Sequence, residues 1–207
     1  MSRPIRVTPE RLLAAAAHEF AAHGFAGARV DRIAARAKAN KAMVYYHFGG
    51  KRDMYRTLLR QLFDRLSASL EEIGRSNGTP TTQLRQAIAA LAGFIETETY
   101  FPAVMLREIA EGGTHLDAKT LTSLGAVPAA IAGIIARGIA TGEFRPVHPA
   151  AAYFSIVAPL PVFKATAPIR SVLGRRKHAP VPTLSMDEFV AHAQDVAARM
   201  LQVGSGQ

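Results

Sequence analysis

The chain has 207 residues, no cysteine and a formal net charge of +9. This length allows one small and one larger hydrophobic core, and the lack of cysteine excludes disulfides, thiolate nucleophiles and cysteine-based metal sites. A hydrophobic content of 49% excludes a disordered chain. We expect no signal peptide, and no membrane span because no run of about 18 apolar residues is free of charges and helix breakers. The expected location is therefore the cytoplasm.

The positive charge is concentrated at one end of the chain. Residues 1–60 contain 12 Lys or Arg and 4 Asp or Glu, a net of +8, whereas residues 61–207 contain 13 and 12, a net of +1. A solvated basic surface would spread its charge along the chain, but a phosphate-binding domain concentrates it. The distribution predicts a nucleic-acid partner for the N-terminal part.

The first helix is predicted to begin after Thr8, which suits an N-cap, with Pro9 in its first turn. We expect Gly24 to end it. His18 and His23 have no paired ligands in the sequence, so we interpret them as surface or packing residues. The preceding arm, residues 2–7, has two open interpretations: its arginines contact DNA, or the arm has no role.

Two short helices follow, at residues 30–37 and 41–48. In the first, Val30, Ile33 and Ala37 recur at the spacing of one buried stripe. Asn40 suits the N-cap of the second, where Val44 and Phe48 share the inward face. A tight turn between two such helices predicts a helix-turn-helix.

The outward face of the second helix has a composition that suits the DNA major groove. A lysine can donate to guanine, an alanine or methionine can contact a thymine methyl, and a tyrosine hydroxyl can reach phosphate. The residues on or beside this face are Lys41, Ala42, Met43, Tyr45 and Tyr46.

The rest of the chain is predicted to be helical throughout. A long helix, residues 51–73, ends at the Gly74–Pro80 turn signal. Further apolar stripes predict helices within residues 84–95, 104–110, 116–141, 149–163 and 184–203. We expect residues 164–183 to be an exposed basic connection, in which Arg175, Arg176 and Lys177 form either a second phosphate contact or a solvated loop.

At residues 8–56 the chain resembles the TetR family of bacterial transcriptional regulators. The resemblance rests on Gly24-Phe25, Val30, Ile33-Ala34 and the run Tyr45-Tyr46-His47-Phe48 followed by Lys51. The chain departs from the family where Lys38-Ala39-Asn40 replaces the usual Gly-Val-Ser/Thr, and where Ala28-Arg29 replaces a Thr or Ser before the valine. A left-handed Lys38 would cost about 1–2 kcal/mol.

The resemblance implies an all-α protein. A three-helix helix-turn-helix DNA-binding domain, residues 1–50, is joined by a long helix to a helical ligand-binding and dimerisation domain, residues 51–207. It also implies that His47, Lys51 and Arg29 contact phosphate, while the residues of the outward face and their cap, Asn40, approach the bases or the adjacent backbone.

A single helix-turn-helix buries too little surface for selective recognition, so we expect a homodimer on a palindromic operator. The resemblance places the dimer contact in the last two large helices, here about residues 123–141 and 149–163. It further implies a pocket for a small, hydrophobic inducer. Aromatic and methionine side chains around a helix break are candidate walls, although each also suits an ordinary core: Phe94, Tyr100, Phe101, Met105, Ile109 and Phe154.

We therefore expect a ligand-responsive repressor that binds a double-stranded DNA operator. The alternative is a DNA-binding regulator or architectural protein without a small-molecule ligand. No nucleophile elbow, phosphate loop or metal-ligand spacing is present, so we expect no enzyme activity, no catalytic residue, no cofactor and no metal. We interpret Glu96, Glu98, Glu108 and Glu111 as a solvated acidic face, although a cationic lipophile would also suit them.

Overall fold

A computed structural model describes residues 8–175 and 184–202. The described residues form helices and one isolated bridge between Phe144 and Gln202, which confirms the all-α prediction. The helices are α1 (Pro9–Gly27), α2 (Val30–Ala37), α3 (Lys41–Phe48), α4 (Lys51–Arg75), α5 (Pro80–Thr97), α6 (Phe101–Ala110), α7 (Ala118–Ala140), α8 (Pro149–Ile156), α9 (Pro159–Ala165), α10 (Ala167–Gly174) and α11 (Met186–Leu201).

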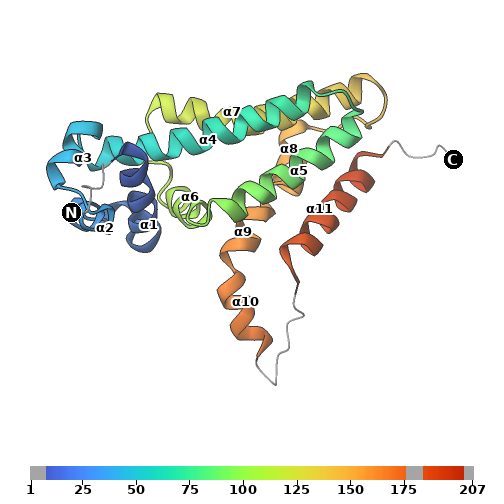
Figure 1. Cartoon of the computed structure of the whole chain (residues 1–207). Helices are drawn as coiled ribbons and strands as arrows, with labels where there is room; N and C mark the ends of the chain where they lie inside the picture. The colour runs from blue at the N-terminus through green and yellow to red at the C-terminus, as the bar shows by residue number, and fades with distance from the viewer. Residues whose placement is uncertain (1–7, 176–183, 203–207) are drawn as a thin grey trace, which may run out of the picture.

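The N-terminal helices form a small cluster at one end of the molecule (Figure 1). Its core contains Phe20 of α1, Ile33 of α2, Val44 of α3 and Met54 of α4, all buried. The last of these comes from the first turn of α4. The small cluster is therefore completed by the helix that leads out of it.

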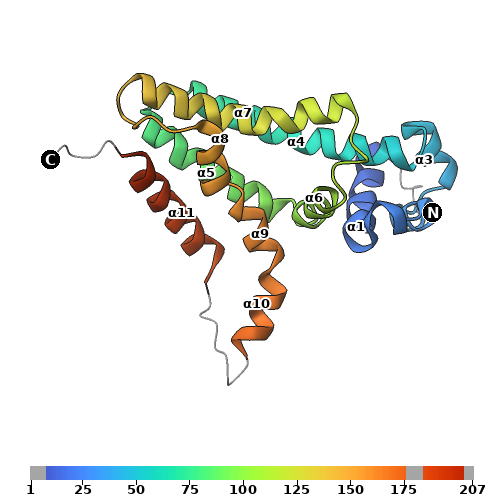
Figure 2. The ribbon, with the colours of Figure 1, turned by 180° about the vertical axis from the view of Figure 1, so that it is seen from behind.

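The helix α4 joins this cluster to the rest of the molecule. It lies side by side with α7, and the rear view shows the same arrangement (Figure 2). Leu59, Leu62 and Leu66 of α4 are buried, as are Ile131 and Ile134 of α7. One continuous helix therefore contributes buried side chains both to the N-terminal cluster and to the packing against α7.

Several boundaries differ from those expected from the sequence. α1 continues past Gly24 to Gly27, with a kink where Gly24 adopts φ 68° and ψ 178°. Residues 164–174 were expected to be an exposed connection, but they complete α9 and form α10. Pro168 stands in the first turn of α10, where its missing N–H has no intrahelical partner to lose. Residues 1–7, which include Arg3 and Arg6, and Arg176 and Lys177 lie outside the described residues.

By length and hydropathy alone α7 could cross a membrane, although it contains the helix breaker Pro128. An 18-residue window of this helix has a mean hydropathy of 1.6, and 28% of the window is buried within the chain. A core helix of a bundle passes the same test, and α7 packs against α4, α5 and α8. Much of its apolar surface nevertheless remains open to another partner.

Candidate nucleic-acid interface

The turn between α2 and α3 depends on a strained residue. Lys38 adopts the left-handed conformation, φ 53° and ψ 45°, and its N–H donates to the carbonyls of Ala34 and Ala35. It is the one non-glycine residue with positive φ in the described part of the chain. Asn40 then caps α3, because its side-chain oxygen accepts the N–H of Ala42 at 2.9 Å. These two residues set the angle at which α3 leaves α2.

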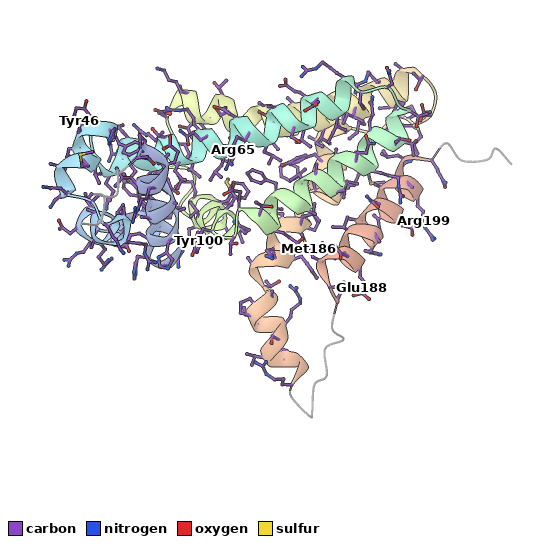
Figure 3. All side chains as sticks on the ribbon, in the orientation of Figure 1. Tyr46, Arg65, Tyr100, Met186, Glu188 and Arg199 are labelled. Carbon is purple, nitrogen blue, oxygen red and sulfur yellow. The ribbon has the colours of Figure 1, made fainter. Side chains whose placement is uncertain are left out.

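The outward face of α3 is open to solvent at the free end of the N-terminal cluster, where Figure 3 labels Tyr46. The Tyr46 side chain is 81% exposed, and Lys41, Ala42 and Tyr45 are exposed beside it. Met43 is half-buried and packs against the core. Val44 is fully buried and holds the helix in place. This face therefore presents a cation, a methyl group and two phenols together.

Lys41 is not free in this structure. Its Nζ lies 2.9 Å from Oδ1 of Asp31 on α2, and both side chains remain exposed to solvent. The hydrogen bond to Asp31 raises the pKa of the Lys41 ammonium. Since the pair is exposed, its energy is small and the lysine can exchange Asp31 for another acceptor.

Arg29 lies at the N-cap of α2 with an exposed side chain. Its backbone N–H donates to the carboxylate of Glu19 at 3.1 Å, and the Nε of Arg32 donates to the same oxygen at 2.6 Å. Burial alone would raise the pKa of Glu19, but these donors outweigh it and the pKa is lowered. Glu19, at 4% exposed, thus fixes the start of α2.

Lys51 has a role that the sequence did not predict. Its Nζ donates to the carbonyl oxygens of Phe25, Ala26 and Ala28, at 2.9, 3.3 and 3.1 Å. All three protons of the ammonium therefore have acceptors at the end of α1. Lys51 clamps the end of α1 to the start of α4, whose N-cap, Gly50, has no side-chain partner and leaves backbone donors open.

His47 is half-buried on α3, and its Nε2 atom is buried without a hydrogen-bond partner among the described residues. Its ring makes an edge contact with Tyr46 at 5.0 Å between centroids. The ring therefore supports the exposed tyrosine from the side.

The six candidate pocket residues do not meet at one place. Phe94 and Phe101 form an edge-to-face pair at 5.3 Å, and Met105 packs against the same core. Tyr100 contacts His18 of α1 instead, at 5.2 Å. Ile109 and Phe154 are 60% and 67% exposed.

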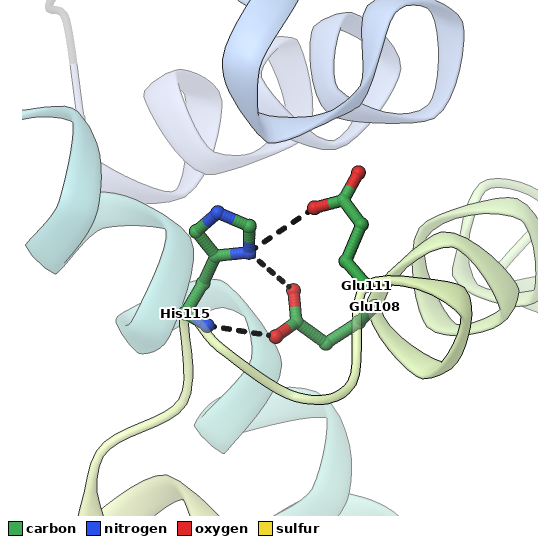
Figure 4. Close-up of side chains that lie close together, drawn as sticks. All are labelled: Glu108, Glu111 and His115. Atoms are coloured by element: carbon green, nitrogen blue, oxygen red, sulfur yellow. Dashed lines mark hydrogen bonds and ion pairs between the residues drawn. The ribbon is translucent and has the colours of Figure 1, made fainter.

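The end of α6 carries a polar cluster that the sequence did not predict (Figure 4). Glu108 does not belong to a solvated acidic face as expected from the sequence, because it is 1% exposed. The hydroxyl of Tyr55, on α4, donates to its Oε2 at 2.8 Å, and the backbone N–H of His115 donates to its Oε1 at 3.0 Å. The spacing of Glu108 in the sequence indicates its burial, because it follows Phe101 and Val104 on one apolar stripe. Glu19 follows Leu12 and Ala16 in the same way.

Known bacterial regulators are similar to this chain in sequence. Residues 12–58 match the family model described as "Bacterial regulatory proteins, tetR family". The transcriptional repressor NicS of Pseudomonas putida is 27% identical over 140 residues, which are 67% of this chain and 66% of NicS. The repressor SCO4008 of Streptomyces coelicolor is 45% identical over 60 residues, 29% of this chain and 31% of SCO4008. The chain thus aligns with less than two thirds of either relative's length.

The fold also matches a solved structure across nearly the whole chain. The transcriptional regulator FadR of Bacillus subtilis, determined in complex with stearoyl-CoA, superposes with a TM-score of 0.73 and 16% identity. The superposition covers 94% of this chain and 100% of that one. At this identity the match concerns the fold, and it extends the likeness from the N-terminal cluster to the C-terminal helices.

Proposed function

Because this chain belongs to the TetR family of bacterial transcriptional regulators, we propose that it is a cytoplasmic repressor. It binds a palindromic operator as a homodimer and is released by a small hydrophobic molecule. The observation that carries the DNA-binding part is the open outward face of α3, with Tyr46 at its most exposed point. Relatives and fold are those of regulators, and the chain is not an enzyme.

In this proposal α3 lies in the major groove. Lys41 and Tyr46 read base edges or the adjacent backbone, and Ala42 and Tyr45 extend the contact. Met43 supports the helix from its half-buried position. Asn40 fixes where the helix begins.

Phosphate contacts surround this helix. Arg29 is exposed at the start of α2, and the open backbone donors at the start of α4 suit a phosphate oxygen. Lys51 supplies positive charge there while it clamps α1, and His47 supports Tyr46. The DNA-binding unit of residues 1–50 therefore needs the first turns of α4 as well, because Met54 and Tyr55 complete its packing.

The homodimer is proposed to form through the C-terminal helices. Among the described residues, half of the large apolar side chains that remain exposed lie on α8–α10 or just before α11: Phe154, Val162, Ile169, Val172 and Leu184. A groove of about 360 Å³ between α7 and α8 adjoins Phe154. Exposed apolar surface of this extent typically marks a protein–protein interface, and it overlaps the helices expected from the sequence.

The effector is proposed to be apolar because the aromatic pair Phe94–Phe101 and Met105 pack in an apolar core, where Phe101 also contacts Phe63 of α4. The Bacillus subtilis FadR structure, with the same fold, holds stearoyl-CoA, so acyl thioesters are the first class to test. Binding must favour one of two conformers by a few kcal/mol to release DNA. The alternative remains a regulator or architectural protein that responds to no small molecule.

The test is selection of preferred sequences from a pool of random duplexes by the purified full-length protein. We expect an inverted repeat with half-sites one helical turn apart, about 34–36 Å, or a multiple of that. Lys41→Ala should alter the selected bases, whereas Lys119→Ala, which removes an exposed cation from α7, should not. Selection of the same motif by Lys41→Ala would refute this placement of α3.

Two further measurements separate the remaining parts of the proposal. Light scattering at micromolar concentration should give a dimer, and a monomer would contradict the two-fold operator. An acyl-CoA series should raise the melting temperature and release the selected DNA. If no member does either, the ligand-free alternative is favoured.

A further inference from the structure

Three metal-ligating side chains gather where α6 meets the loop to α7 (Figure 4). One ligand atom each from Glu108, Glu111 and His115 lies within 4.8 Å of the other two. We propose that these residues bind one divalent transition-metal ion, with Zn²⁺ as the first candidate. Their spacing in the chain is Glu-x-x-Glu-x-x-x-His, which differs from the His-x-x-x-His spacing of common helical metal sites.

The distances suit this class of ion. Nδ1 of His115 lies 3.0 Å from Oε2 of Glu108 and 3.3 Å from Oε2 of Glu111. Ligand atoms about 2.1 Å from a tetrahedral Zn²⁺ are about 3.4 Å apart. A small closing movement of Glu111, whose side chain is 40% exposed, would bring its oxygen into the first coordination sphere.

Hydrogen bonds from the His115 ring cannot satisfy both carboxylates of this cluster. Nδ1 of an imidazole carries at most one proton, yet two carboxylate oxygens from different residues face it. A metal ion bound to all three atoms satisfies both carboxylates at once. It also balances two negative charges, one of which is on the almost fully buried Glu108.

The surroundings hold the ligands as metal sites require. Tyr55 and the backbone N–H of His115 orient the Glu108 carboxylate, at 2.8 and 3.0 Å. The Phe25 ring lies against the imidazole at 4.1 Å between centroids. Such outer partners fix ligand orientation and raise affinity. Arg56 donates to the His115 carbonyl at 2.9 Å and also lies 3.8 Å from both Asp53 and Asp117.

The position of the site gives it a regulatory consequence, which rests on the proposed function. His115 contacts Phe25 at the end of α1, and Glu108 contacts Tyr55 near the start of α4. An ion that holds α6 and its loop together therefore fixes the surface on which the DNA-binding helices rest. Occupancy should change the affinity for the operator.

The experiment uses full-length, tag-free protein stripped of metal with a chelator. Zn²⁺ is titrated against a chromophoric chelator, stoichiometry is measured by native mass spectrometry, and melting is followed with and without Zn²⁺. We expect one Zn²⁺ per chain with micromolar or tighter affinity, and a melting temperature raised by several degrees. Glu111→Gln and His115→Gln should each weaken binding by at least about tenfold.

Glu71→Gln is the matched control, because Glu71 is an exposed acid paired with Arg75 on α4, and it should bind Zn²⁺ like the parent. Absence of bound Zn²⁺, or equal affinity in Glu111→Gln and the parent, would overturn the site. A Glu111→Gln variant that melts earlier but binds no less Zn²⁺ would show a metal-free hydrogen-bonded cluster instead. DNA affinity is measured separately, so a protein that binds Zn²⁺ but no DNA refutes the proposed function and leaves the site standing.

Discussion

Lys38 is a strained residue in the turn between α2 and α3, because it adopts the left-handed conformation. A side chain in the left-handed conformation costs about 1–2 kcal/mol because its Cβ approaches the following carbonyl oxygen. The turn keeps this geometry since Asn40 and the buried Val44 fix α3 on the other side. The lysine therefore adds positive charge beside α3 at the expense of stability.

Replacing Lys38 should release this strain. We expect Lys38→Gly to raise the free energy of unfolding by about 1 kcal/mol, which is the strain relieved less the greater entropy of glycine in the unfolded chain. Urea denaturation measures the change. Lys38→Ala removes the same charge but keeps the Cβ, so it should not stabilise. Equal stability in the two variants would mean that charge, and not backbone strain, governs this position.

Asp31 is an acidic residue that pairs with Lys41 on the outward face of α3. It holds Lys41 at 2.9 Å and places a negative charge next to the surface proposed to approach phosphate. Asp31→Asn should tighten binding to duplex DNA several-fold and steepen the salt dependence by up to about one unit of log affinity per log salt. Fluorescence anisotropy over a salt series tests this. Asp64→Asn, on the exposed face of α4, provides the control. An equal gain in DNA affinity in this variant would mean that only the net charge of the protein changed, and that the position of Asp31 beside Lys41 does not matter.

At the scale of elements, the helices with clear caps and stripes were predictable. Thr8, Asn40 and Ser185 each cap a helix in the structure, as their residue types indicated. α10 was missed because none of its residues is buried, so it has no apolar stripe facing a core, and because Pro168 suggested a loop. Helical periodicity reports burial within one chain, and no residue of α10 is fully buried there.

The candidate site was predictable to a similar extent. The sequence pattern indicated the α3 face and its cap, which need only the geometry of one helix. It could not indicate the three carbonyl oxygens around Lys51 or the bond from Tyr55 to Glu108, since the partners are 53 residues apart in the second case. Contacts between distant segments depend on how whole helices pack, which local periodicity does not encode.

Gly138 illustrates such a contact between elements. A Cβ at this position would lie 2.1 Å from the Phe144 ring, and the N–H of Phe144 donates to the Gly138 carbonyl at 2.9 Å. Phe144 in turn pairs with Gln202, beyond the end of α11. Because Phe144 packs so closely on Gly138, the segment after α7 folds back against this helix and pairs with the end of α11.

Gly138→Ala should therefore lower the free energy of unfolding by about 1–3 kcal/mol, because the ring must move within a packed core. Thermal or urea unfolding measures the loss. Gly93→Ala on α5 is matched to it, since a Cβ there meets nothing within 4 Å, and helix propensity should make that change neutral or stabilising by up to about 1 kcal/mol. Similar behaviour of the two variants would contradict the role of the Phe144 contact.

At the scale of the whole molecule, the N-terminal cluster is joined to the remaining described helices by the long helix α4 and by the buried hydrogen bond between Tyr55 and Glu108. α4 carries Tyr55 into the space between the N-terminal cluster and α6, where its hydroxyl donates to Glu108. The phenol also makes edge contacts with Phe20 and Phe25 of α1. A movement of α6 on ligand or metal binding would therefore act on α1 through this residue.

The same contact should make the stability of the protein sensitive to alkali. Burial, followed by the hydrogen bond to Glu108, raises the pKa of Tyr55 above its usual value near 10. The stabilisation is then complete below pH 10. Above that pH the unfolded chain loses the phenolic proton while the folded chain keeps it, so the free energy of unfolding falls by up to about 1.4 kcal/mol per pH unit from this group.

Tyr55→Phe removes both the hydrogen bond and the titrating proton. At pH 8 the variant should be less stable by roughly 1.5–3 kcal/mol, the value of a hydrogen bond to a charged group. Because the variant lacks the alkaline loss, its deficit should shrink as the pH rises from 9 to 11 in urea denaturation. Tyr46→Phe, on the 81% exposed side chain, should follow the parent throughout. If the Tyr55→Phe and parent curves stay parallel above pH 10, the phenol titrates alike in the folded and unfolded chains, and Tyr55 is not the buried link between α4 and α6.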